Sequence, residues 1–147
     1  MAEIAMPMDD RQFNQSIAAS RVATGAASEM FCAADLFVKG YLVSKPLRDG
    51  SRYDLIVDRD GVFYRIQVKT LSKSGQAPIG YIKYTEDTYG KGLQQRTIPK
   101  YQGHEFDILA VVDRETKEVY YIPVSEIDFS KPNVPVNAEA RERFRAF

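Results

Sequence analysis

Apolar residues recur at helical spacing in the N-terminal part of the chain, over about 15–39. This segment is rich in alanine, the strongest helix former, and Gly40 follows it as a helix stop. Gly25 interrupts the pattern, so we expect two helices, with the main one over about 26–39. The residues before this pattern, 1–12, are expected to form a flexible arm.

The pattern then changes to short apolar or alternating runs, which are typical of strands. Five strands are predicted, over 41–44, 53–59, 62–70, 106–112 and 119–124. The second and third flank Asp60-Gly61, the strongest short signal for a hairpin turn. The fourth is almost continuously apolar, which indicates a central strand. A short helix is expected in the tail, 137–147.

Residues 71–100 show no clear periodicity and contain many Ser, Gly, Pro, Tyr and Lys residues. We expect a long loop here, because a stretch of this length in a compact domain is usually functional or mobile. The order of elements predicts one domain over 1–147 of the α/β (α+β) class, with a mixed sheet of four to five strands flanked by helices.

Composition narrows the class of protein. The chain has 147 residues, of which 44% are hydrophobic, enough for a core and against a disordered chain. The single cysteine, Cys32, excludes an internal disulfide and favours a reducing compartment. No apolar run reaches the length that spans a membrane, and the acidic N-terminus is not a signal peptide, so a cytoplasmic location without membrane partners is expected.

Charge is unevenly distributed, although the formal net charge is zero. Residues 61–100 carry seven basic and two acidic side chains, whereas 101–128 carry two basic and seven acidic ones. The basic stretch could form a phosphate-binding face, or it could be a solvated loop with scattered lysines. The candidate DNA contacts in and beside this stretch are Arg65, Lys73, Lys83, Lys91, Arg96, Lys100 and Tyr101.

The predicted hairpin brings three polar residues to one face. With a two-residue turn, Asp54 lies opposite Gln67, at a typical β-carbon separation of about 4.5–5.5 Å. Lys69 shares that face because it lies two residues beyond Gln67. Carboxylate and amide oxygens suit Mg²⁺, and a nearby lysine could activate water or stabilise charge on a phosphate. The alternative is an ordinary solvated face of a hairpin.

Glu29 is the candidate second carboxylate. It lies in the main predicted helix on a face shared with apolar residues, where a charged side chain is unusual unless it has a specific role. It could join Asp54 at a metal site, or it could simply be stabilised by the helix dipole in the first helical turn.

Glu29 in a helix, Asp54 in a strand and Gln67-x-Lys69 in the next strand together resemble the PD-(D/E)-x-K nuclease superfamily. The stretch 25-GAASEMFCAADLFVKGYLVSKPLRDGSRYDLIVDRDGVFYRIQVKT-70 is similar to a small branch typified by an intron-encoded homing endonuclease of cyanobacteria. In that branch glutamine replaces the usual Asp or Glu of the motif. The later segments 106–113 and 119–127 also fit the pattern.

The resemblance implies a restriction-endonuclease-like fold and an Mg²⁺-dependent endonuclease, with Mn²⁺ as a possible substitute. Glu29, Asp54 and Gln67 would be metal ligands, and Lys69 the catalytic lysine. The implied partner is duplex DNA, cut by a homodimer or homotetramer. Three alternatives stay open: a Holliday-junction resolvase acting on branched DNA, a non-catalytic DNA-binding module, and a subunit of a larger machine.

Overall fold

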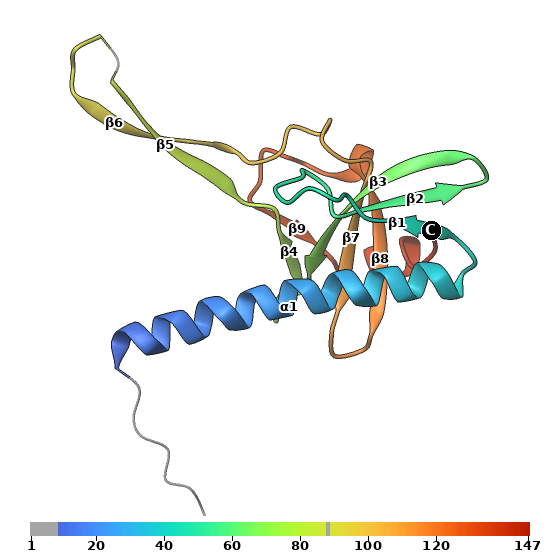
Figure 1. Cartoon of the computed structure of the whole chain (residues 1–147). Coiled ribbons are helices and arrows are strands. Elements are labelled where there is room, and N and C mark those ends of the chain that lie inside the picture. The colour runs from blue at the N-terminus through green and yellow to red at the C-terminus, as the bar shows by residue number, and fades with distance from the viewer. Residues whose placement is uncertain (1–8, 88) are drawn as a thin grey trace, which may run out of the picture.

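The computed structural model describes residues 9–87 and 89–147. A long helix is followed by a central sheet, a projecting hairpin and a short C-terminal helix (Figure 1). In chain order the elements are α1 (Asp10–Val38), β1 (Leu42–Ser44), β2 (Leu55–Arg59), β3 (Val62–Thr70), β4 (Gln76–Pro78), β5 (Tyr81–Asp87), β6 (Leu93–Pro99), β7 (Ile108–Asp113), β8 (Glu118–Pro123), a 3-10 turn (Val124–Glu126), β9 (Asn133–Pro135) and α2 (Ala138–Arg143).

Helix α1 is continuous, so the expected split at Gly25 is wrong. A glycine in a helix interior costs only about 1 kcal/mol, which the alanine-rich sequence around it can offset. The helix begins at Asp10, so the last residues of the expected N-terminal arm are helical, whereas 1–8 lie outside the described residues. It ends as predicted before Gly40, which has a φ of 88° and donates its N–H to the carbonyl of Phe37.

The predicted mixed sheet is confirmed, with five strands in the order β1-β2-β3-β7-β8. Strands β3 and β7 are parallel, and the other neighbours are antiparallel. Each predicted strand matches an observed one to within about two residues. The restriction-endonuclease-like class is therefore the observed fold.

Two apolar clusters lie on opposite faces of the sheet. Helix α1 covers one face, where Cys32 and Leu36 pack with residues of β2, β3, β7 and β8. The other face is covered by the β4–β9 pair and α2, with Phe106 and Tyr120 fully buried there. No described helix is long and apolar enough to span a membrane.

Residues 71–100 do not form the expected loop, because they contain β4 and a hairpin made of β5 and β6. The hairpin pairs from Tyr81 and Pro99 to Asp87 and Leu93, and it projects from the body on the same side as the N-terminal half of α1 (Figure 1). Residues 93–98 are all exposed. A ribbon that is solvated on both faces has no inward and outward side, which explains why alternation failed to reveal it.

Candidate active site

The β2–β3 hairpin has the predicted register, with Arg59 opposite Val62. Asp60 and Gly61 have φ values of 53° and 84°, as a two-residue turn with positive φ at both positions requires. This register leads directly to the contact between Asp54 and Gln67.

Asp54 stands immediately before β2 and is fixed by its neighbours on β3. Its Oδ2 accepts hydrogen bonds from Gln67 Nε2 at 2.7 Å and from the backbone N–H of Val68 at 2.8 Å. Its own N–H donates to the carbonyl of Ile66 at 2.8 Å. The carboxylate is therefore held in one orientation by backbone and side chain together.

Each partner in this contact keeps an oxygen available. Within the described part of the chain, no group donates a hydrogen bond to Asp54 Oδ1 or to Gln67 Oε1. Gln67 is only 6% exposed, so its amide oxygen is a buried acceptor without a partner among the residues that the structure describes. Such atoms are costly unless a ligand, ion or water satisfies them.

The charge balance around Asp54 also favours a cation. Burial raises the pKa of Asp54, the nearby carboxylate of Glu29 raises it further, and the Val68 N–H and Lys69 lower it. A bound cation would offset the burial and the repulsion from Glu29 that disfavour the charged form of Asp54.

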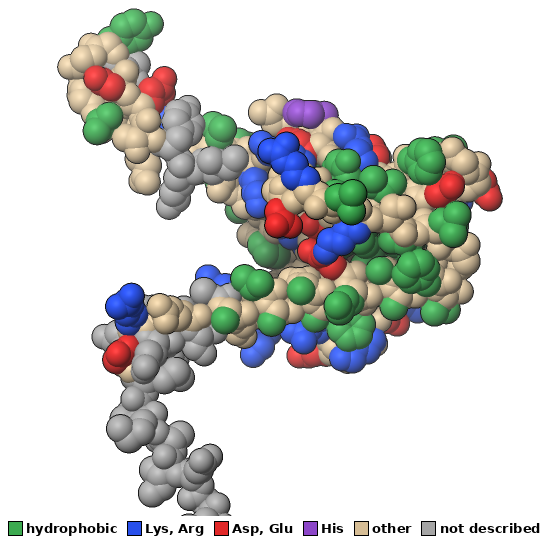
Figure 2. All heavy atoms as spheres, in the orientation of Figure 1, with side chains coloured by type: hydrophobic (Ala, Val, Ile, Leu, Met, Phe, Trp, Pro, Cys, Tyr) green, Lys and Arg blue, Asp and Glu red, His purple; other side chains and the backbone are tan. Residues whose placement is uncertain are grey.

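Glu29 reaches the same region from α1. A groove of about 850 Å³ is lined by Glu29, Asp54, Gln67 and Lys69, together with α1 residues before Glu29 and Lys100. The opening beside the N-terminal half of α1 is visible in Figure 2. Glu29 Oε2 accepts from Lys45 Nζ at 2.8 Å, and Lys45 follows β1.

Lys69 is the basic residue of this groove. Burial lowers its pKa, the positive charge of Lys100 lowers it further, and Asp54 raises it. Its Nζ lies 5.8 Å from the centre of the Tyr101 ring. A lysine with a lowered pKa can exchange a proton nearer neutral pH than an ordinary one.

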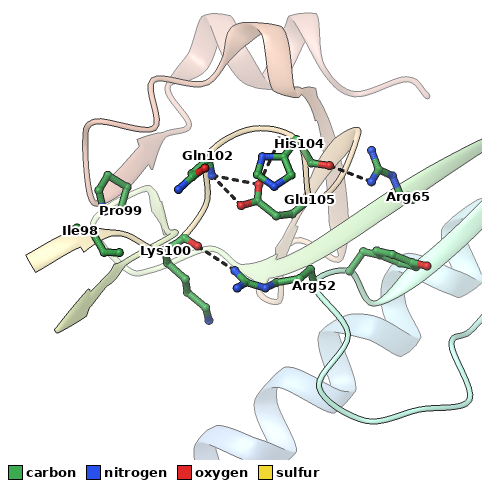
Figure 3. A pocket seen from close by; sticks show the side chains of 9 residues that line it. Arg52, Arg65, Ile98, Pro99, Lys100, Gln102, His104 and Glu105 are labelled. Carbon is green, nitrogen blue, oxygen red and sulfur yellow. Dashed lines mark hydrogen bonds between the residues drawn. The ribbon is translucent and has the colours of Figure 1, made fainter. Parts of the chain in front are cut away.

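A second pocket of about 470 Å³ adjoins the groove and shares Lys100 with it (Figure 3). Arg52 donates to the carbonyl of Lys100 at 3.2 Å. Glu105 accepts backbone N–H groups from Gln102, Gly103 and His104, which lowers its pKa despite its burial. These bonds shape the loop that precedes β7.

Two of the predicted DNA contacts are engaged within the protein itself. Arg65 is engaged by Asp107 at 2.9 Å and by the carbonyl of His104 at 2.9 Å. Tyr101 is only 4% exposed and packs on Phe106, so its ring belongs to the core.

Four of the other basic candidates have exposed side chains. Lys73 follows β3, Lys91 lies in the turn of the β5–β6 hairpin, and Lys100 follows β6. Arg96 on β6 forms an ion pair with Glu86 at 3.4 Å. The side chain of Lys83 lies outside the described residues.

Sequence reasoning missed Lys45 and Arg52. Both follow β1 in a loop without any periodic signal, and each contacts a residue far away in the sequence. No local pattern encodes such a contact, so only the folded arrangement reveals it.

The side-chain oxygens that line the groove suit a hard cation, although they do not form a dense cluster of acidic residues. The described residues contain no group of three or more His, Cys, Asp or Glu side chains placed to hold a metal. The available ligands are instead two carboxylates and one amide, from Glu29, Asp54 and Gln67, which are oxygen donors of the kind Mg²⁺ prefers.

The structure thus brings a glutamate on a helix, an aspartate immediately before a strand and a Gln-x-Lys sequence on the next strand to one groove. A family model described as PD-(D/E)XK endonuclease matches residues 19–144, and the chain belongs to that family. The chain is similar to protein 5.3 of Escherichia phage T7, with 40% identity over 89 residues, covering 60% of this chain and 70% of that protein.

Among solved structures, the chain resembles the bacterial homing endonuclease I-Ssp6803I. The TM-score is 0.52 and the sequence identity 25%, over 74% of this chain and 72% of that chain. The predicted superfamily and its homing-endonuclease-like branch are confirmed.

Proposed function

We propose that this protein is a metal-dependent endonuclease that hydrolyses phosphodiester bonds in duplex DNA, in the manner of homing or restriction enzymes. The observation that carries the proposal is a pair of oxygens, Asp54 Oδ1 and Gln67 Oε1, that receive no hydrogen bond from any described residue, in a groove that also holds Glu29 and Lys69. The family and the structural neighbour support it, since both are endonucleases by description.

The residues present fit a divalent cation, with Mg²⁺ as the first candidate and Mn²⁺ as a substitute. Asp54 and Gln67 would hold it with their free oxygens, and Glu29 would contribute from α1. A bound cation would supply electrostatic stabilisation of the charge that develops on the phosphate.

Lys69 has a separate role. Its lowered pKa suits it to accept or hold a proton from the attacking water, and its charged form can stabilise the phosphate. The hydrogen bonds from Val68 and Gln67 keep Asp54 oriented while DNA binds.

We further propose that the β5–β6 hairpin and the residues flanking it contact the DNA. A two-stranded ribbon fits the major groove of B-form DNA. The hairpin and its flank carry exposed Lys91, Arg96 and Lys100, and Lys73 lies before β4. The Glu86–Arg96 ion pair lies on the exposed ribbon and is weak enough to exchange for a phosphate.

The test is cleavage of supercoiled plasmid with and without Mg²⁺, comparing the wild type with Asp54→Asn and Lys69→Met. We expect each variant to lose at least about 100-fold in rate, as is usual when one such group is removed. Asp60→Asn is the matched control, because it makes the same chemical change at the exposed end of the same hairpin. Equal cutting by the wild type and both site variants would refute the proposal.

The substrate shape needs its own experiment. A linear duplex and a four-way junction of the same sequence, incubated side by side, separate a homing- or restriction-like enzyme from a junction resolvase. Preferential cutting of the duplex supports the proposal, whereas preferential cutting of the junction favours the resolvase.

One observation favours a second candidate, a DNA-binding module without catalysis. The Gln67 amide donates to Asp54 Oδ2 at 2.7 Å, so it satisfies part of the carboxylate without any cation. Salt-sensitive DNA binding without cleavage in either Mg²⁺ or Mn²⁺ would identify this function.

A further inference from the structure

The outward side of α1 carries an apolar stripe, made of Ala19, Val22, Ala23, Ala26, Met30, Ala34 and Phe37. These residues recur at helical spacing on the side opposite Ser28, Cys32 and Leu36, which face the sheet. All seven are exposed, with Val22 and Met30 at 74% and Phe37 at 57%. Apolar atoms along the helix are visible in Figure 2.

Solvent-facing sides of helices normally carry charged and polar residues, and a helix that is apolar on both sides is usually buried on both. Between Ala19 and Val38 the helix has three charged residues, Arg21, Glu29 and Asp35, and none of them belongs to the stripe. Scattered exposed apolar residues need no explanation, but a continuous stripe indicates a contact surface.

We propose that the stripe pairs with the same stripe of a second copy of this chain, with the two α1 helices antiparallel around a two-fold axis that crosses the stripe at the level of residue 28 along the helix, on the side away from the sheet. This arrangement places large side chains opposite small ones. Phe37 meets Ala19, Val22 meets Ala34, and Met30 meets Ala26. A two-fold interface requires such self-complementarity, because each contact occurs twice.

The shape of the chain also favours a second copy as the partner of the stripe. The N-terminal half of α1 extends beyond the sheet (Figure 1), and Ala19, Val22 and Ala23 are not covered by any described part of their own chain. In the antiparallel pair this half lies along the C-terminal half of the partner helix, which the partner's sheet supports. The proposal uses this surface alone and does not depend on nuclease activity.

The area of the stripe sets the strength of the contact. From Ala19 to Phe37 the helix is about 27 Å long and about 10 Å wide, so it covers roughly 300 Å² on each copy. Val38 and Leu42 lie beyond Phe37 and are 89% and 70% exposed. A stable interface needs about 800 Å² per partner, so this dimer dissociates on dilution.

Sedimentation velocity of the full chain over a range of concentrations tests the dimer. The wild type should shift from monomer to dimer, and Val22→Lys and Met30→Lys should each weaken association by at least about 30-fold, as buried interface anchors do. Leu93→Lys is the matched control, because Leu93 is 78% exposed on the hairpin and lies off the stripe. Circular dichroism and thermal melting identify any variant that fails to fold.

Cross-linking tests the antiparallel arrangement. Chains with Val22→Cys are mixed with chains carrying Ala34→Cys and treated with a short bismaleimide. Native Cys32 stays silent because it is fully buried, and burial raises the pKa of its thiol to about 12. We expect dimers in the mixture and little in either variant alone, since identical positions in an antiparallel pair would be about 18 Å apart.

Cross-linking within either single variant would indicate parallel helices and overturn the arrangement. A wild type that stays monomeric at every concentration would overturn the dimer and point to a different protein as the occupant of the stripe. A dimer that survives both lysine substitutions would place the interface elsewhere, which also overturns the proposal.

Discussion

Replacing Gln67 with glutamate tests the central contact of the site most directly. In the wild type, Gln67 Nε2 donates to Asp54 Oδ2 at 2.7 Å, and Gln67 is only 6% exposed. Gln67→Glu keeps the size and shape of the side chain but replaces this donor with a second carboxylate oxygen. The hydrogen bond becomes a contact between two negative charges.

The cost follows from the distance. Two like charges about 3 Å apart repel by about 5 kcal/mol at an effective dielectric constant of 20. Protonating one carboxyl instead, from an ordinary pKa of about 4.3, costs about 5 kcal/mol at pH 8 and about 1 kcal/mol at pH 5. Side-chain movement relieves part of this, so we expect Gln67→Glu to lose about 3–5 kcal/mol of unfolding free energy at pH 8 and about 1–2 kcal/mol at pH 5.

In the Gln67→Glu variant, the proton shared by the two neighbouring carboxyl groups determines how stability changes with pH. The folded variant holds a proton that the unfolded chain releases above its ordinary carboxyl pKa, so stability falls as pH rises. A divalent cation reverses this loss, because it binds the two carboxylates of the folded state and adds about 2.7 kcal/mol at a hundred times its dissociation constant.

The assay is urea unfolding at pH 5 and pH 8, with and without Mg²⁺, for the wild type, Gln67→Glu and Gln95→Glu. Gln95 is exposed on β6 and lies opposite Thr85, so its replacement makes the same chemical change without a carboxylate directly across from it, and its stability should stay within about 0.5 kcal/mol of the wild type. If Gln67→Glu is as stable as the wild type at pH 8 without metal, the contact with Asp54 is not the one the structure shows.

Two further predictions concern the catalytic lysine and the core. Because the charge of Lys100 lowers the pKa of Lys69, Lys100→Met should move the alkaline rise of the cleavage rate, measured at saturating DNA, to higher pH; an unmoved profile would exclude Lys69 as the titrating group. Leu36→Ala empties a fully buried position under the sheet and should cost about 2–5 kcal/mol in urea unfolding, whereas Leu47→Ala, at a fully exposed position, should cost under about 0.5 kcal/mol; equal losses would contradict the assigned core.

The parts of the fold that the sequence predicts are those with a buried side and an exposed side. The Asp60-Gly61 turn fixes the β2–β3 register, because its backbone conformation allows one pairing only. That register in turn predicts the contact between Asp54 and Gln67, which the structure confirms at 2.7 Å. For Glu29 the residues alone left a metal ligand and a charge stabilised by the helix dipole as alternatives, and the family resemblance favoured the first, because the distance from Asp54 depends on how α1 packs on the sheet.

The features that the sequence did not predict have no comparable local pattern. The described side chains of the β5–β6 hairpin are exposed up to Ile98, so burial imposes no alternation on that part of its sequence. Gly25 looked like a helix break because propensity is local, but the packing of α1 on the sheet outweighs one glycine. The pairing of Lys45 with Glu29 and of Arg65 with Asp107 joins segments far apart in the chain, so it depends on the sheet order rather than on any motif.

Glutamine at position 67 has a physical advantage in this particular site. A carboxylate there would face Asp54 at hydrogen-bond distance, and without a cation one of the two would have to be protonated. The amide removes this conflict, because its N–H holds Asp54 in place while its oxygen is left without a partner among the described residues. The metal-free protein can therefore fold with the site already arranged. Compared with a carboxylate at position 67, however, glutamine provides one negative charge less to attract the cation. Glu29, which lines the same groove and is paired with Lys45 at 2.8 Å, carries the remaining nearby carboxylate.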